Sequence, residues 1–142
     1  MRVLKMKNVI LIVALFLFSS FSVFAGVEVI VHPSNANEID ANEIKKIFTG
    51  KAKSFADGSK ALPITLADGN PITDEFNEKV LNKSSSQLKA YWSKLVFTGK
   101  GTPPKEASND AEVISLVANN PNLIGFVKQG SADASVKVVQ SF

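Results

Sequence analysis

The loop at residues 67–73 has residue types that could hold a small anion. Gly69 gives it flexibility, and the side chains of Asn70 and Thr73 can donate hydrogen bonds where the pair Asn70-Pro71 predicts a helix start. Helix N-termini attract anions because their first amides are unpaired and their macrodipole is positive there. Pro71 removes one of those amides, which weakens the predicted site.

Asp68 repels an anion, although a carboxylate can accept a hydrogen bond from a protonated oxyanion. An ordinary capped helix start also accounts for this loop.

A second polar loop, Ser34-Asn35-Ala36-Asn37, follows the first predicted strand, and ligands of parallel α/β domains lie beyond strand carboxyl ends. A solvated turn is the alternative interpretation of that loop. We expect loops 33–37 and 67–73 to form one ligand mouth. Its candidate ligand-binding residues are Ser34, Asn35, Asp68, Gly69, Asn70 and Thr73.

Catalytic and metal chemistry find little support in the sequence. The chain has no cysteine and one histidine, His32, so thiolate ligands are absent and a metal site would depend on carboxylates. No serine stands in a Gly-x-Ser-x-Gly elbow, and His32 at a strand end is interpreted as a structural residue. We therefore expect no catalytic residue, no metal and no cofactor.

The elements that must position these loops follow from periodicity and caps. Strands and helices alternate, which predicts an α/β domain. The predicted strands are 27–32, 62–66, 123–127 and 135–140, and the predicted helices run from the cap Asp40 to Gly50, from Asn70 through Val80, over 85–98 and from about 109 to Asn120.

The 85–98 helix has the best apolar stripe of the chain. Its stripe residues, at i, i+3, i+4, i+7 and i+8, are Leu88, Tyr91, Trp92, Leu95 and Val96. We therefore expect Trp92 to be buried in the main core against the sheet.

The first 25 residues have the profile of a secretory signal peptide. Residues 1–7 are basic, residues 8–24 are mostly apolar, and Val23 and Ala25 precede a possible cleavage point at Gly26. We expect residues 1–25 to be a signal peptide and 26–142 to be one domain in the periplasm or medium, away from the membrane. An uncleaved membrane anchor is the alternative.

Removing the leader makes the chain electrically neutral. The leader holds three of the 16 basic residues, and the remaining 13 lysines match the 13 aspartates and glutamates. Binding to nucleic acid depends on neutralising phosphates with a positive surface. We therefore expect no nucleic-acid partner.

Several short segments resemble one family when they are taken in order. They are Ile47-Phe48-Thr49-Gly50-Lys51, Phe55-Ala56-Asp57-Gly58, Phe76, Tyr91-Trp92, Phe97-Thr98-Gly99, Pro103-Pro104 and Ile124-Gly125-Phe126-Val127. Together they resemble the substrate-binding proteins of phosphate ABC transporters, and in particular short single-lobe relatives. The resemblance implies one lobe of a type II periplasmic-binding-protein-like α/β fold, with a small mixed sheet flanked by helices. It also implies capture of a small anion such as phosphate without catalysis.

The chain departs from that family where the ligand is held. Family members close two lobes over the ligand, whereas the residues from Gly26 onward suffice for one lobe. The arginine and the Ser-Gly-Thr run that the family carries before the helix of Phe76 are not matched in residues 65–73. We expect weak or lost anion binding. The alternative function is a non-catalytic envelope protein that docks on a partner through the same lobe, and a homodimer that rebuilds the missing half of the cleft is a third possibility.

The signal-peptide hypothesis predicts that the exported protein begins at Gly26. The expected intact mass of protein secreted by a native-like host is that of residues 26–142. A mass equal to all 142 residues would instead identify a retained membrane anchor.

Overall fold

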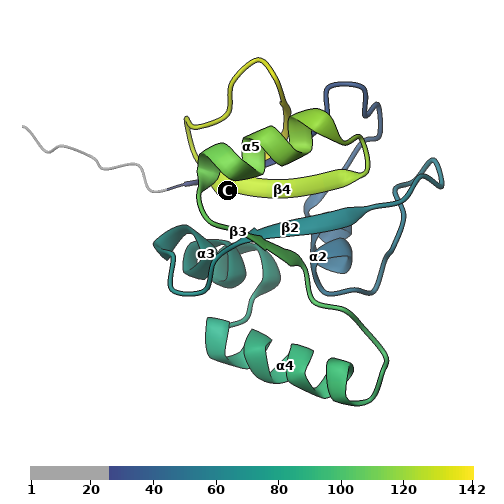
Figure 1. Ribbon diagram of the computed structural model, residues 1–142, viewed down its shortest axis with the longest axis vertical. Coiled ribbons are helices and arrows are strands. Elements are labelled where there is room, and N and C mark those ends of the chain that lie inside the picture. The colour runs from purple at the N-terminus through teal and green to yellow at the C-terminus, as the bar shows by residue number, and fades with distance from the viewer. Residues whose placement is uncertain (1–25) are drawn as a thin grey trace, which may run out of the picture.

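The computed structural model describes residues 26–142, so the predicted signal peptide lies outside the described residues. Five strands form one sheet in the order β3-β2-β4-β1-β5 (Figure 1). The strands are β1 (Val27–Val31), β2 (Leu62–Leu66), β3 (Lys105–Ala107), β4 (Leu123–Lys128) and β5 (Lys137–Ser141). β2 is parallel to β3 and β4, whereas β1 is antiparallel to β4 and β5. The predicted α/β class with a small mixed sheet is confirmed.

Each helix begins at a polar residue whose side chain accepts a hydrogen bond from a first-turn amide, except η1, which continues directly from α3. The helical segments are α2 (Ala41–Phe48), α3 (Pro71–Phe76), the π-helical turn η1 (Asn77–Leu81), α4 (Ser85–Phe97) and α5 (Asp110–Asn119). Ser84 and Gln87 form a reciprocal capping box at the start of α4. No helix within residues 26–142 has the length and apolar character needed to cross a membrane.

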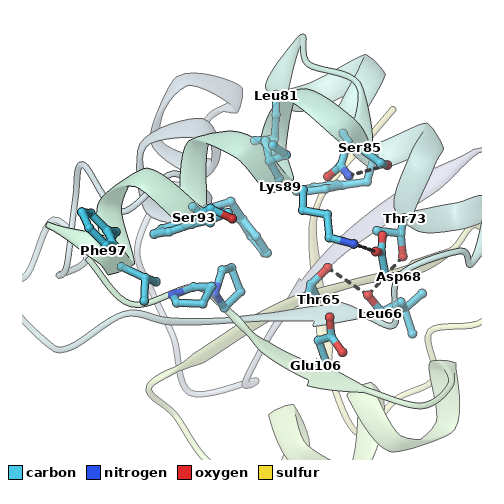
Figure 2. Close-up of a pocket in the computed structure, with 18 residues that line it drawn as sticks. Thr65, Leu66, Asp68, Thr73, Leu81, Ser85, Lys89, Ser93, Phe97 and Glu106 are labelled. Atoms are coloured by element: carbon cyan, nitrogen blue, oxygen red, sulfur yellow. Dashed lines mark hydrogen bonds and ion pairs between the residues drawn. The ribbon is translucent and has the colours of Figure 1, made fainter. Parts of the chain in front are cut away.

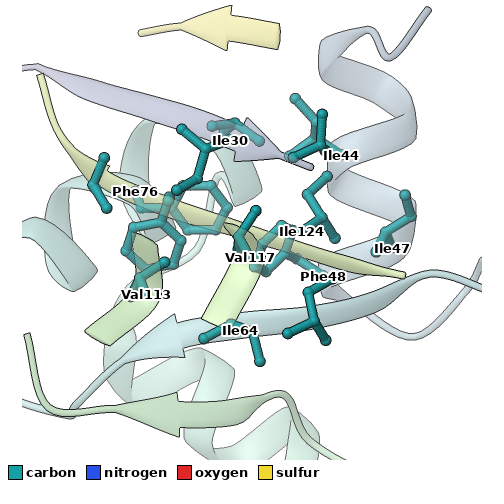
Figure 3. Close-up of a cluster of buried hydrophobic side chains, with 14 of the residues drawn as sticks. Ile30, Ile44, Ile47, Phe48, Ile64, Phe76, Val113, Val117 and Ile124 are labelled. Atoms are coloured by element: carbon teal, nitrogen blue, oxygen red, sulfur yellow. The ribbon is translucent and has the colours of Figure 1, made fainter. Parts of the chain in front are cut away.

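The two faces of β4 determine how the helices cover the sheet, because consecutive strand residues point to opposite faces. The ring of Phe126 stacks on Phe76 of α3, with centroids 4.0 Å apart, and lies 5.9 Å from the ring of Phe48 in α2. Gly125 faces the other side, where a Cβ would lie 2.6 Å from Cγ1 of Val113 in α5. The sheet is therefore covered by α5 on one face and by α2 and α3 on the other. Figure 3 shows buried side chains of these helices, among them Val113, Phe48 and Phe76.

Two strands differ from their sequence-based predictions. β3 was not predicted because Lys105-Glu106-Ala107 has no β-branched or aromatic residue, and it pairs only as a short edge strand along β2. β5 begins at Lys137 rather than Ser135, because the Ser135 amide and hydroxyl both bond to the Asp133 side chain in a turn.

The burial of Trp92 is confirmed, but its predicted place in the main core is wrong. Trp92 is 8% exposed, yet it lies outside the core cluster and packs against the loop glycines Gly50 and Gly101. The left-handed Asn82, with φ of 53°, ends η1 and redirects the chain. As a result α4 lies apart from the sheet and the helices that cover it, beyond the β3 edge (Figure 1).

The aromatic cluster predicts a large loss on truncation of Phe76. Phe76→Ala should lower the free energy of unfolding by about 3–5 kcal/mol, because it leaves a cavity beneath Phe48 and Phe126. Urea unfolding at low protein concentration measures this loss in the free energy of unfolding. The matched control is Phe97→Ala at a side chain that is 92% exposed, where we expect a change within about 0.5 kcal/mol. Equal losses in the two variants would contradict the core assignment.

Candidate functional site

A groove of about 550 Å³ lies between α4 and the β2–β3 edge of the sheet (Figure 2). One wall is made by α4, and the opposite wall is made by β2, β3 and the Pro103-Pro104 segment. Most of its lining is apolar, with Leu88, Trp92 and Phe97 on the α4 side. The volume lies within the range of about 300–1,000 Å³ that is usual for ligand pockets.

Polar side chains gather at one end of the groove, beside the carboxyl ends of β2 and β3. Asp68 and Glu106 bring two carboxylates there, and Lys89 of α4 brings one ammonium group (Figure 2). The Lys89 Nζ lies 3.6 Å from Asp68 Oδ2, and both side chains are largely exposed. An exposed ion pair of this kind contributes about 0–1 kcal/mol. This end of the groove therefore has a net negative charge, which opposes anion binding.

The loop at 67–73 lies at this polar end, but the Thr73 hydroxyl, one of its two expected donors, is already engaged. The buried Thr73 hydroxyl lies 3.2 Å from the Leu66 carbonyl and 3.1 Å from the Ala67 carbonyl, and it donates to them. Asn70 accepts a hydrogen bond from the Ile72 amide as the cap of α3. Gly69 has φ of 85° and supplies the turn between β2 and α3. Local structure thus uses the Thr73 hydroxyl, whereas the hydrogen bond of Asn70 uses its side-chain oxygen and not its NH2 donor.

The expectation that loops 33–37 and 67–73 form one mouth is wrong. Because β1 is antiparallel to β4 and β4 is parallel to β2, the end of β1 lies at the same end of the sheet as the start of β2. Loop 33–37 is therefore at the opposite end of the sheet from loop 67–73. The reversed direction of β1 separates Ser34 and Asn35 from the rest of the predicted site.

The first loop is held by its own hydrogen bonds. Ser34 Oγ is 2.7 Å from Nδ1 of His32, which is consistent with the structural role predicted for that histidine. The buried Asn35 accepts from the backbone and side-chain nitrogens of Asn37, and its carbonyl accepts from Lys137 Nζ at 3.1 Å. Ser34 and Asn35 therefore shape a turn between β1 and α2 and do not line the groove.

The carboxylates whose pKa is shifted lie outside the groove and accept hydrogen bonds from nearby serines. The Ser59 hydroxyl lowers the pKa of Asp57, the Ser108 amide lowers the pKa of Glu112, and the Ser135 hydroxyl lowers the pKa of Asp133. Each hydrogen bond stabilises the charged form of its exposed carboxyl. Within residues 26–142 no three His, Asp or Glu side chains gather in a way that could hold a metal ion.

Trp92 fixes α4 against the rest of the lobe. A Cβ on Gly50 would lie 2.9 Å from Cη2 of Trp92, so the indole needs a glycine at this position, where φ is 74°. The neighbouring Tyr91 hydroxyl donates to the Thr49 carbonyl at 2.6 Å. Trp92 Nε1 is buried without a hydrogen-bond partner among the described residues. The buried indole of Trp92 and the hydrogen bond of the Tyr91 hydroxyl therefore anchor α4, the helix that forms the outer wall of the groove.

Three residues that give the groove its charge and its open apolar end were not among the predicted site residues: Lys89, Glu106 and Phe97. Nothing in the sequence brings Lys89 and Glu106 together, because their approach depends on where α4 lies relative to β3. Phe97 did carry a signal. It falls outside the apolar stripe of its helix, so burial of that stripe leaves it exposed.

These features define the class of fold. A mixed five-stranded sheet between two helical layers, with a groove beside the carboxyl ends of two parallel strands, is one lobe of a periplasmic-binding-protein-like fold.

Solved structures place the chain more narrowly. It is similar to a Clostridium perfringens protein assigned as a phosphate ABC transporter substrate-binding protein and solved with bound phosphate, with 22% identity and a TM-score of 0.65. An ABC-type phosphate transport receptor from Vibrio cholerae has 18% identity and a TM-score of 0.64, and PstS from Borrelia burgdorferi has 15% and 0.62. The sequence matches no protein-family model and no curated protein.

The similarity covers 82% of this chain but only 44%, 46% and 47% of those three proteins, respectively. The chain therefore spans less than half the length of the solved structures it resembles. The resemblance expected from the ordered sequence segments is confirmed at the level of the fold, as a single lobe.

The position of Trp92 predicts a local effect of its removal. Trp92→Ala should destabilise α4 by about 3 kcal/mol or more, because a 13-residue helix is marginal without tertiary contacts. Amide hydrogen exchange in α4 should then speed up about a hundredfold, while β1 and β4 keep their protection. Tyr91→Phe is the milder control, with an expected cost of about 1 kcal/mol. If amide exchange in the sheet sped up as much as in α4, the result would place Trp92 in the main core.

Proposed function

We propose that the chain is an exported solute-binding module that holds a small oxyanion such as phosphate only weakly and catalyses no reaction. The fold and the groove beside the strand ends support a solute-binding role. The observation that carries the weakness is the engagement of the Thr73 hydroxyl in local hydrogen bonds, beside the carboxylates of Asp68 and Glu106. Within this proposal, residues 1–25 are the signal peptide and residues 26–142 are the binding lobe.

Lys89 is the one cation among the residues that line the groove. An anion at the polar end would have to compete with Asp68 for the Lys89 ammonium group, and its binding would break the ion pair whose Nζ and Oδ2 atoms lie 3.6 Å apart. Phosphate keeps a proton near neutral pH and could donate it to Asp68, which leaves a binding mode that a fully deprotonated anion lacks. Charge-assisted hydrogen bonds are roughly twice as strong as neutral ones, so this single lysine dominates the remaining affinity.

A thermal titration tests the proposed weakness. We expect no shift of the melting temperature with about 0.1 mM phosphate, because this concentration lies below the dissociation constant of a weak site. A ligand present at a hundred times its dissociation constant would instead add about 2.7 kcal/mol to the free energy of unfolding. A small shift at tens of millimolar phosphate should disappear in Lys89→Ala and persist in Lys46→Ala, an exposed lysine on α2. Sulfate is the control for general stabilisation by salt, because it is excluded from protein surfaces as phosphate is but carries no proton near neutral pH.

A shift of about 10 °C with about 0.1 mM phosphate would refute the weak site, since it implies a dissociation constant near 1 µM. Identical shifts with sulfate and in Lys89→Ala would refute specific binding in this groove.

A second candidate function is docking on a partner protein of the cell envelope. The observation that favours it is the exposed end of α4, where Phe97 is 92% and Val96 is 53% exposed. Both side chains also line the groove, so the apolar surface is continuous from the helix end into the groove. Contiguous exposed apolar surface is a mark of interaction sites.

A further inference from the structure

We propose that the chain holds a second ligand site, a lysine-lined pocket at the amino end of β2, which takes a small phosphate ester with an apolar body. The pocket has a volume of about 340 Å³, within the usual range of ligand pockets. It lies at the other end of β2 from Asp68 and Thr73, which line the groove. The proposal goes beyond the weak oxyanion site of the groove and does not depend on it.

Three segments that are far apart in the sequence meet at this lysine-lined pocket. They are the end of α2, the start of β2 and the loop that follows α4. Trp92 connects the first segment to the third, because its indole lies against both Gly50 and Gly101. Trp92 is also the one residue that lines both this pocket and the groove. The pocket therefore depends on the same indole contacts that fix α4.

The charge of this pocket is opposite to that of the polar end of the groove. Lys53, Lys60 and Lys100 line the pocket, and none of the described aspartates or glutamates does. None of these three lysines takes part in an ion pair within residues 26–142. Three uncompensated ammonium groups around one small pocket repel one another and attract an anion with more than one negative charge.

The ends of α2 and α4 do not account for these lysines. A helix C-terminus carries a partial negative charge of about half an elementary charge, which attracts cations. Both helices end in the same sequence, Phe-Thr-Gly-Lys, at 48–51 and 97–100, and the glycine and lysine amides of each bond back to carbonyls of the last turn. These carbonyls therefore have backbone partners, and the three lysine charges exceed the two partial charges of the helix ends.

The lining of the pocket favours a phosphate ester with an apolar body. Lysine binds phosphate as a point charge, whereas a carboxylate is matched best by the fork of an arginine, and no arginine lines this pocket. The rest of the wall is largely apolar and includes Ile47, Leu62 and Trp92, of which Leu62 is 37% exposed. An apolar or aromatic body is stabilised by covering this wall, and inorganic phosphate has no such body. We therefore expect a phosphomonoester of an apolar or aromatic alcohol.

Nuclear magnetic resonance of the nitrogen-labelled protein tests the site, with phenyl phosphate as the probe. At low salt the amides of Gly99 and Gly101 and the single indole of Trp92 should shift along saturable curves. The expected dissociation constant is on the order of 0.1–1 mM, because exposed charge pairs are weak. The amide of Gly69, in the loop between β2 and α3, should not shift. Raising the ionic strength to about 0.5 M should weaken the binding.

Paired lysine variants test the charge of the pocket. Lys60→Gln/Lys100→Gln removes two of the three ammonium groups and should weaken phenyl phosphate binding about tenfold. The matched control is Lys46→Gln/Lys128→Gln, which removes two exposed lysines outside the pocket and changes the net charge equally. Its effect should stay below about twofold, because distant surface charges are screened by salt. The amide spectrum of each variant shows whether the fold is kept.

Two further ligands separate the parts of the probe. Phenol lacks the phosphate and inorganic phosphate lacks the ring, so each should shift the same amides at least about tenfold more weakly than phenyl phosphate. Phenol that binds as tightly as phenyl phosphate would overturn the role of the lysines. Inorganic phosphate that binds as tightly would overturn the role of the apolar wall.

The site itself is overturned by the absence of saturable shifts up to about 10 mM phenyl phosphate. Shifts centred on Gly69, or equal weakening in the two paired variants, would also overturn it. The solute-binding proposal for the groove is tested separately. Lys89→Ala removes the cation of the groove and should leave phenyl phosphate binding unchanged, because Lys89 does not line the second pocket.

Discussion

The contact between Phe76 and Phe126 is the interaction on which the arrangement of this lobe depends. The two rings stack at 4.0 Å with an interplanar angle of 7°, and Phe48 closes the cluster from α2 with its ring 4.8 Å from Phe76. This contact holds α3 on the sheet and thereby sets the direction of η1 and of the chain that leads to α4. The groove exists because α4 leaves the layered body after that fixed point, and Trp92 alone of its side chains is buried.

The polar end of the groove shows how local structure competes with ligand binding. A buried hydroxyl or amide must find a partner within the protein when no ligand supplies one, because an unpaired buried polar group costs about 1–3 kcal/mol. The buried Thr73 hydroxyl satisfies that requirement through the Leu66 and Ala67 carbonyls. The hydroxyl that steadies this helix start is therefore not free for an anion, and the nearby carboxylates make the remaining space unfavourable for one.

A single lobe also leaves surface open along the outer edge of the sheet. The chain spans less than half the length of the solved structures of similar fold. Here β3 is a short edge strand with charged Lys105 and Glu106, which discourages pairing of further strands. The exposed Phe97 lies beyond that edge, on α4.

The caps, the helix ends and most strands could be predicted from the sequence, because these features depend on neighbours within a few residues. Asp40, Asn70 and Ser84 begin helices where the sequence predicted them, and Gly50 adopts the positive φ expected of a helix end. The family resemblance also indicated the single lobe. The direction of β1 could not be predicted in this way, and it separates Ser34 and Asn35 from Asp68 and Thr73 in the folded chain. The same holds for the position of α4 away from the core, which brings Lys89 to Asp68 and leaves Phe97 in solvent. Strand direction and helix placement depend on packing between residues far apart in the chain, and such packing has no signature in local spacing.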